Sequence, residues 1–119
     1  MLEPRRFFEK VVPALVMQSF YDFLEQEGSI SFDVKDAGQW TFVFGSEEPV
    51  QRGLTKDAAL KLTFTKKAFD GFVDGSLDVV AAVQAKEVTG KGDFSLLEAF
   101  GRILRPPAQN LWGEVNTVG

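Results

Sequence analysis

Residues 58–86 most constrain the fold, because they specify a strand and two helices with defined ends. Residues 58–65 alternate between apolar and polar side chains, which is typical of a strand with one buried face. Thr65 is a favoured residue before a first helical turn, and Gly75 is the residue type that ends a helix in a left-handed conformation. Asp78 is suited to precede a second short helix. The order strand, helix, helix is therefore predicted for this stretch.

The rest of the chain is expected to complete an α+β fold around a five-stranded, mostly antiparallel sheet. Two alternating runs joined by turn residues at 36–38 predict an antiparallel hairpin. Pro13 removes a backbone hydrogen bond, so a break or kink is expected there in the first helix. The expected elements are helices over 4–26, 65–75, 79–86 and 93–105, and strands over 29–35, 39–45, 50–53, 58–65 and 88–92.

One face of the predicted sheet is uniformly large and apolar, while Ser, Asp, Lys and Thr side chains on the other face are expected to meet water. Twelve phenylalanines in 119 residues are many for a small domain. Such bulky side chains either interdigitate at core density or line a space, and composition alone leaves both readings open. The residues expected to point inward are Phe32, Trp40, Phe42, Phe44, Leu62, Phe64, Phe69, Phe72, Val83, Leu96, Phe100 and Leu104.

The predicted first helix carries more apolar residues than packing on one surface requires. Its main stripe recurs at spacings of three and four residues, and Phe7, Val11, Met17 and Tyr21 widen it. Two readings remain open: a helix sunk deeply in the core, or a helix that also meets a ligand or a second subunit.

Charge and composition exclude several functions. A net charge of −4 and an isoelectric point near 4.8 argue against a nucleic-acid partner. The chain has neither histidine nor cysteine, so Ser-His and Cys-His nucleophiles and zinc sites built on those side chains are ruled out. No catalytic residue, metal site or cofactor is predicted. Zero cysteine fits a reducing compartment, and no apolar run reaches the roughly 20 residues of a membrane span. A soluble, cytoplasmic protein is expected.

The chain is expected to form a single domain over residues 1–119, with a helical segment at 1–27 and a tail at 106–119. Pro106 and Pro107 cannot continue the last helix. The tail also carries Leu111 and Trp112, and both a folded-back flap and a loose end fit its sequence.

Several short motifs follow one another in a familiar order: Gly38-Gln39-Trp40, Arg52-Gly53, Asp57-Ala58, Leu60 to Thr65, Phe69, Gly75 to Asp78, Ala82, Lys91 to Asp93, and Leu96 to Leu104. In this order and spacing the chain resembles the sterol carrier protein two (SCP-2-like) lipid-binding domain family. It departs from the family at Lys86, where glycine is usual, and at Gly90, where an apolar residue is usual.

The resemblance implies helices on one face of the sheet enclosing a hydrophobic tunnel, with no catalytic residues. It implies binding, and transfer between membranes, of a fatty acid, fatty acyl-CoA, sterol or phospholipid, with transient membrane contact. The twelve inward residues above are then the expected lipid-binding residues. Arg52, Lys66 and Lys67 are candidates to meet a head group at the tunnel mouth; the alternatives are that they are ordinary surface charges and that water alone meets the head group. The alternative is a dimerisation or interaction module with the same fold and a filled core, for which a homodimer is one form.

Overall fold

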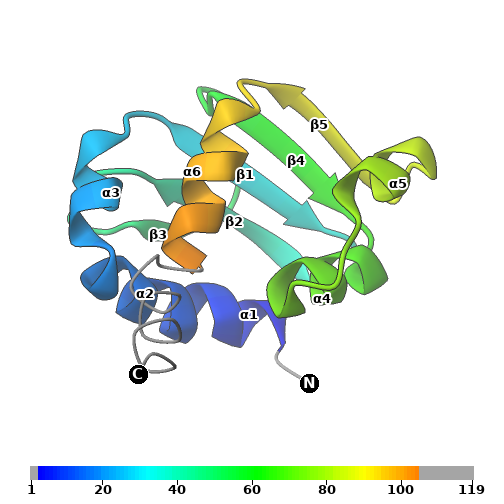
Figure 1. Ribbon diagram of the computed structural model, residues 1–119, viewed down its shortest axis with the longest axis horizontal. Coiled ribbons are helices and arrows are strands. Elements are labelled where there is room, and N and C mark those ends of the chain that lie inside the picture. The colour runs from blue at the N-terminus through cyan, green and yellow to red at the C-terminus, as the bar shows by residue number, and fades with distance from the viewer. Residues whose placement is uncertain (1–2, 105–119) are drawn as a thin grey trace, which may run out of the picture.

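The structure is a computed structural model, and the residues that it describes are 3–104. Figure 1 shows a sheet with helices gathered on one side of it. The elements in chain order are α1 (Pro4–Arg6), η1 (Phe7–Val11), α2 (Val12–Gln18), α3 (Phe20–Glu25), β1 (Ser29–Val34), β2 (Gly38–Val43), β3 (Val50–Arg52), β4 (Leu60–Phe64), α4 (Lys66–Asp74), α5 (Val79–Gln84), β5 (Val88–Gly92) and α6 (Ser95–Leu104).

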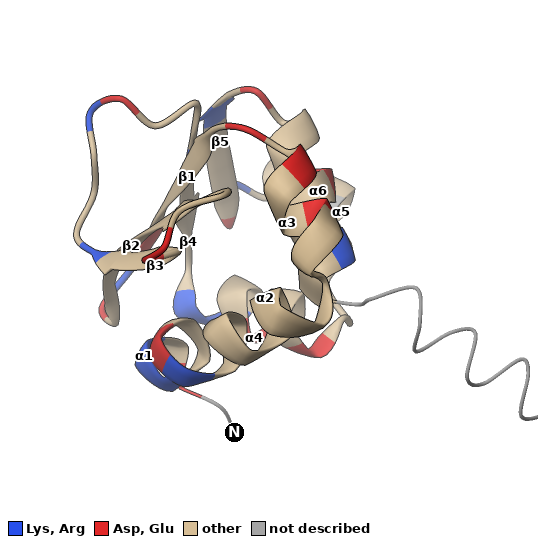
Figure 2. Cartoon of the chain, turned by 90° about the vertical axis from the view of Figure 1, so that its left-hand side faces the viewer, with Lys and Arg blue, Asp and Glu red and all other residues tan. Residues whose placement is uncertain are grey.

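The five strands form one mixed sheet in the order β3-β2-β1-β4-β5. Three neighbouring pairs are antiparallel, and the central pair, β1 and β4, is parallel with Phe32 opposite Leu62. Since β3 lies at one edge and β4 lies beyond β1, the connection over residues 53–59 must cross the sheet. It does so on the face away from the helices (Figure 2). The expected α+β class, five-stranded sheet and one-sided helical layer are confirmed.

The core lies between the sheet and the helical layer. Strand residues on the inner face meet α6 across the middle of the sheet, α4 at one end and the N-terminal helices along another side (Figure 1). The two-residue repeat of the strands and the three-to-four-residue repeat of the helices place large apolar side chains in this single layer. The residues buried there include Phe8, Ile30, Phe32, Phe42, Leu60, Leu62, Phe64, Phe69, Leu96, Phe100 and Ile103.

The outer face of the sheet is not fully open to water, which corrects the expectation from alternation. Ser31 and Thr41 are buried because the 53–59 connection lies over them. The Thr41 hydroxyl donates to the Gly53 carbonyl at 2.7 Å, and the Thr55 amide donates to the Ser31 hydroxyl at 3.4 Å. Two buried hydroxyl groups are therefore satisfied by the backbone that covers them.

The first helical segment is interrupted, but its main break is at Ser19 rather than at Pro13. Ser19 has φ −121° and ψ 43°, which ends α2 and begins α3. Pro13 instead follows a π-helical turn, in which the Val12 amide donates to the Phe7 carbonyl. That wider turn gives the proline ring room beside the preceding carbonyls, so the chain passes Pro13 without a break.

The helix ends after β4 are those that the sequence predicts. The Thr65 side chain accepts a hydrogen bond from the Ala68 amide, and the Asp78 side chain accepts one from the Ala81 amide. Gly75 lies between the two helices with φ 85°, the left-handed conformation expected of it. Helix α5 ends at Gln84, two residues before the expected end, because Lys86 adopts φ 61° and turns the chain into β5.

Candidate functional site

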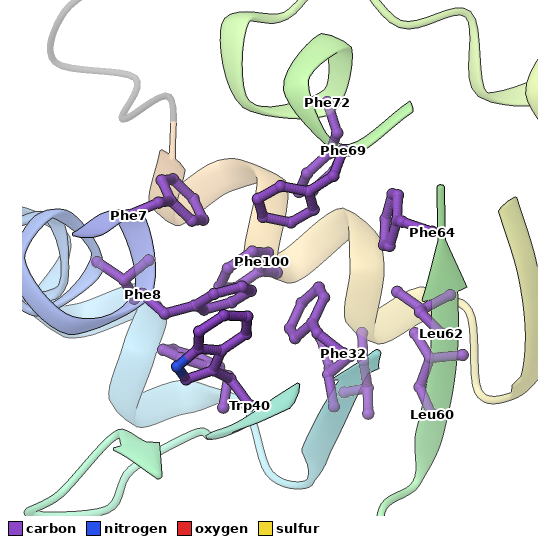
Figure 3. Packing of buried hydrophobic residues seen from close by; sticks show 14 of the residues in the cluster. Phe7, Phe8, Phe32, Trp40, Leu60, Leu62, Phe64, Phe69, Phe72 and Phe100 are labelled. Atoms are coloured by element: carbon purple, nitrogen blue, oxygen red, sulfur yellow. The ribbon is translucent and has the colours of Figure 1, made fainter. Parts of the chain in front are cut away.

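The most distinctive feature of the inner layer is a set of aromatic rings in mutual contact, here called the aromatic layer. It consists of Phe7, Phe8, Phe32, Trp40, Phe42, Phe64, Phe69, Phe72 and Phe100, most of which Figure 3 labels. The rings come from the sheet, from η1, from α4 and from α6. Helices and sheet therefore meet largely through phenyl and indole side chains.

Phe8 lies at one centre of the aromatic layer. Its ring centroid is 4.9 Å from those of Phe32 and Trp40 and 5.4 Å from that of Phe69. These contacts join η1 to two strands and to α4. Ring pairs at such separations stabilise by about 0.5–1.5 kcal/mol each beyond the area that they bury.

Phe100 is the second centre, on α6. Its ring lies 5.2 Å from Phe32, 4.9 Å from Phe42 and 6.2 Å from Phe72. Phe72 also lies 5.4 Å from Phe64. The two centres share Phe32, so one continuous set of contacts runs from the N-terminal helices to α4.

The structure brings most of the expected inward residues together. Ten of the twelve are buried, and Leu104 is half-buried against the core. Val83 is the exception, with 47% of its surface exposed, so the expectation that it points inward is wrong. Helix α5 packs on β5 through Ala82, and the next residue along a helix points about 100° away. The ten buried residues are Phe32, Trp40, Phe42, Phe44, Leu62, Phe64, Phe69, Phe72, Leu96 and Phe100.

The predicted site set omitted the first helical segment, which supplies rings at the heart of the layer. Phe7 and Phe8 of the layer are at most 2% exposed, and so is Phe23, whose ring contacts that of Phe42 at the edge of the layer. Their spacing placed them on an apolar stripe, and that stripe was the available signal. What the spacing could not reveal is that η1 lies against Trp40 and Phe69 rather than at the rim of the domain.

The expected tunnel is not seen within residues 3–104. The cavities described there open at the surface: about 360 Å³ on the outer face of the sheet, about 530 Å³ beside the N-terminal helices, and about 370 Å³ between α4 and α5. None of these three is lined by a ring of the aromatic layer, but a smaller cavity of about 210 Å³ at its rim is lined by Trp40 together with Glu9 and Arg52. Between helices and sheet, the rings of the aromatic layer lie in contact with one another.

Near the rim of the aromatic layer, the Glu9 carboxylate accepts three side-chain hydrogen bonds from two residues. Arg52 donates to it twice, from Nε and Nη2, each at 2.8 Å, and Trp40 donates its indole N–H at 3.2 Å. The hydrogen bonds from Arg52 and then Trp40 lower the pKa of Glu9 from about 4.5 to about 2. Arg52, a predicted head-group contact, is thus engaged with Glu9, whereas Lys66 and Lys67 are exposed at the start of α4.

The α2–α3 segment leaves a patch of apolar side chains in solvent, here called the α3 face. It consists of Met17, Phe20, Tyr21 and Leu24, which are between 46% and 81% exposed. The joint between these helices also holds a buried hydroxyl: Ser19 is 6% exposed, and its Oγ has no hydrogen-bond partner among residues 3–104. Such a group costs about 1–3 kcal/mol, so the joint is held less firmly than a satisfied one.

Residues 3–104 hold neither a metal-binding cluster nor a membrane-spanning helix. They contain no cluster of three or more acidic residues placed to hold a metal ion. None of their helices is long and apolar enough to cross a bilayer.

The sequence matches no protein-family model and no curated protein. Its fold, however, resembles several solved structures. One is sterol carrier protein 2 from Yarrowia lipolytica in its apo form, at 19% identity and TM-score 0.64, covering 85% of this chain and 83% of that one. Another is palmitated SCP2L2 from Aedes aegypti, at 14% identity and TM-score 0.66, covering 87% of this chain and 96% of that one.

The same fold also occurs as a small part of a larger enzyme. A stereoselective inverting sec-alkylsulfatase from Pseudomonas sp. matches at 19% identity and TM-score 0.65, and the match covers 84% of this chain but 16% of the enzyme. At these identities the likeness establishes the fold alone. The chain has the SCP-2-like fold.

Proposed function

We propose that this domain binds a lipid non-catalytically in the aromatic layer and transfers it between membranes through transient contact. The ligand class is a fatty acid, fatty acyl-CoA, sterol or phospholipid. The fold supports this reading, because solved sterol carrier proteins share it and one of them is described as palmitated. The cytoplasm is the compartment that we propose, from the sequence alone.

The observation that carries the proposal is the make-up of the interface between helices and sheet. Phe8, Phe69, Phe72 and Phe100 reach down from three helical elements onto strand rings. A phenyl ring turns about only two side-chain bonds, so a few rotamer changes with a small shift of a helix open space for a chain. An acyl chain then replaces ring–ring contacts with ring–methylene contacts of the same apolar kind.

The energetic balance permits both loading and release. An acyl chain of about 16 carbons gains roughly 13 kcal/mol on leaving water for an apolar site, before binding costs of about 4–15 kcal/mol are subtracted. A bilayer interior offers a similar gain. Exchange between protein and membrane is then close to balanced, which a carrier requires.

The helical layer opens, in this proposal, at the α2–α3 joint. Two features make that joint the weakest part of the layer: the non-helical backbone of Ser19 and its buried hydroxyl, which has no hydrogen-bond partner among residues 3–104. Helix α3 also packs on α6, which carries Phe100, so movement of α3 frees one wall of the aromatic layer.

Trp40 provides a direct test of this proposal. The chain has two tryptophans, so Trp112→Phe leaves Trp40 as the only one, and Trp40 stacks on Phe8. Titration of that variant with palmitate should change Trp40 emission and saturate at one ligand per chain. Lipid extraction from the purified protein, followed by mass spectrometry, should identify a co-purifying lipid. Finding no lipid and no saturable change in emission would contradict the proposal.

A second candidate function is favoured by a different observation. The aromatic layer is filled in this conformation, while the α3 face is exposed, as expected of an interaction module that pairs through α2 and α3. Light scattering with size-exclusion chromatography distinguishes the candidates. A stable dimer that dissociates when Met17, Phe20, Tyr21 and Leu24 are all changed to Ser, in a protein that binds no palmitate, would favour the interaction module.

A further inference from the structure

A cavity of about 360 Å³ lies on the outer face of the sheet, where Ser31, Asp33, Lys61 and Thr63 line it beside the 53–59 connection. Its floor is built from the parallel pair β1 and β4, where Ser31 faces Lys61 and Asp33 faces Thr63 in register. Its roof is the connection that crosses the sheet, which contributes Leu54, Thr55 and Lys56. The space corresponds to about a dozen water molecules, enough for a small organic molecule.

The roof is fixed to the sheet, so the cavity does not depend on ligand binding to form. The Gly53 amide donates to the Gln39 carbonyl at 2.9 Å, and the Thr41 hydroxyl donates to the Gly53 carbonyl. The Thr55 amide donates to the buried Ser31 hydroxyl. A roof held at both Gly53 and Thr55 keeps Leu54 and Lys56 over the floor, which lowers the entropic cost of binding.

Two lysines line this cavity and a third lies on the neighbouring strand, and none of the three makes an ion pair within residues 3–104. Lys56 and Lys61 line it, and Lys91 on β5 lies directly opposite Lys61 across the antiparallel β4–β5 pair. Like charges directly opposite each other destabilise a sheet. Asp33 is the one acidic residue in the cavity lining. The lining itself therefore carries a net charge of +1, from Lys56 and Lys61 against Asp33, in a chain whose overall charge is −4.

We propose that this cavity binds a small organic monocarboxylate. Its carboxylate lies between Lys56 and Lys61, where it relieves the repulsion between Lys61 and Lys91. Its apolar body packs beneath Leu54 and along the aliphatic stems of the lysines. The Asp33 carboxylate in the lining disfavours a dianion because it repels a second negative charge. The hydroxyl groups of Thr55 and Thr63, also in the lining, can hydrogen-bond a further polar group of the ligand. The site is separate from the aromatic layer and does not rest on the proposed lipid function.

The test is a nuclear magnetic resonance titration of the whole chain with sodium butyrate, with ionic strength held constant by replacing sodium chloride. Amide shifts should concentrate at Thr55, Lys61 and Thr63 and should saturate. Butyramide, the uncharged analogue, and inorganic phosphate, largely a dianion above neutral pH, should each bind at least about tenfold more weakly. Lys61→Gln and Lys56→Gln should each weaken butyrate binding about fivefold or more. Arg102→Gln, which removes a positive charge from an exposed position of α6, should leave butyrate binding unchanged.

Stability separates this proposal from a purely structural role of the lysines. Without butyrate and at low salt, Lys61→Gln should melt no lower than the parent protein, because it removes a repulsive pair. Butyrate should raise the melting temperature of the parent but not of this variant. The proposal is overturned if butyramide or phosphate matches butyrate, or if the shifts spread over all exposed lysines. It is equally overturned if both Gln variants bind butyrate as the parent does. If Lys61→Gln does not fold, Lys56→Gln in the exposed roof tests whether a lysine charge in the cavity is needed for butyrate binding.

Discussion

Glu9 and Arg52 lie 43 residues apart in the sequence and form a two-point ion pair, with both N–O distances at 2.8 Å. The pair fastens the N-terminal helical segment to the edge strand β3. The third hydrogen bond, from Trp40, links it to the aromatic layer. A polar clamp at the rim therefore fixes how η1 lies over the sheet, while the rings beneath it supply the apolar contact.

The clamp predicts a specific pH dependence of stability. The pKa of Glu9 is lowered to about 2 in the folded protein, from about 4.5. Stabilisation by a group with a lowered pKa is complete above its unfolded pKa and is lost as pH falls toward its folded pKa. Glu9→Gln should thus lower the melting temperature above about pH 5, and the deficit relative to the parent should vanish between about pH 4.5 and 2. Thermal melts of the parent and Glu9→Gln proteins across pH 2–7 measure this difference in melting temperature.

Glu3→Gln is the matched control for this measurement. Glu3 is exposed and makes no side-chain capping hydrogen bond at the start of α1. Its substitution should leave the melting temperature nearly unchanged at every pH. A deficit in Glu9→Gln that stayed constant down to pH 2 would show that the carboxylate charge is not what matters.

Gly75→Val should destabilise the domain by about 1 kcal/mol or more. Gly75 joins α4 to the turn before α5 with φ 85°, where a β-branched side chain is strained. Gly101→Ala is the opposite case, since Gly101 is helical and an added Cβ meets nothing within 4 Å. It should stabilise by up to about 1 kcal/mol. Urea unfolding measures the free energy of unfolding of both variants. Equal changes in the two variants would contradict the assignment of Gly75 to a left-handed turn and of Gly101 to a helix.

Val83 and Phe100 were both expected to point inward, and the structure predicts opposite consequences for them. Phe100 is fully buried among other rings, so Phe100→Ala should cost about 3–5 kcal/mol. Val83→Ser on exposed α5 should change stability by no more than about 0.5 kcal/mol and should leave palmitate binding unaltered. Chemical denaturation measures both. A large loss in Val83→Ser would mean that α5 is packed differently.

Lipid affinity should follow chain length rather than head group. The aromatic layer offers rings and aliphatic groups, and Arg52 at its rim is already paired with Glu9. Each added methylene should tighten binding by about 0.8 kcal/mol until the space is full. A fatty acid and its methyl ester should bind alike, since an exposed ion pair contributes only about 0–1 kcal/mol. Displacement titrations across chain lengths test this, and esters about tenfold weaker at every length would reveal a buried polar partner.

The sequence by itself determined the strands, the helices after β4 and the apolar surface of the sheet, but not the interruption of the first helical segment at Ser19. Alternation along 58–65 predicted β4, and Thr65, Gly75 and Asp78 predicted where the next two helices begin and end. These features depend on local backbone preferences and on the two-residue and 3.6-residue repeats, which act over a few residues. Ten of twelve inward positions followed from them.

Tertiary structure alone decided everything that joins distant residues. The pairing of Glu9 with Arg52, the burial of Ser31 and Thr41 beneath the 53–59 connection, and the parallel placement of β1 beside β4 leave no local signal. Val83 is exposed because α5 packs on β5 with Ala82 as its buried residue, and Val83 points away from that side. The two-residue and 3.6-residue repeats of the sequence indicate which side of a strand or helix is apolar. The path of the chain decides which element covers that side. It also decides whether aromatic rings or a ligand occupy the space between the helices and the sheet.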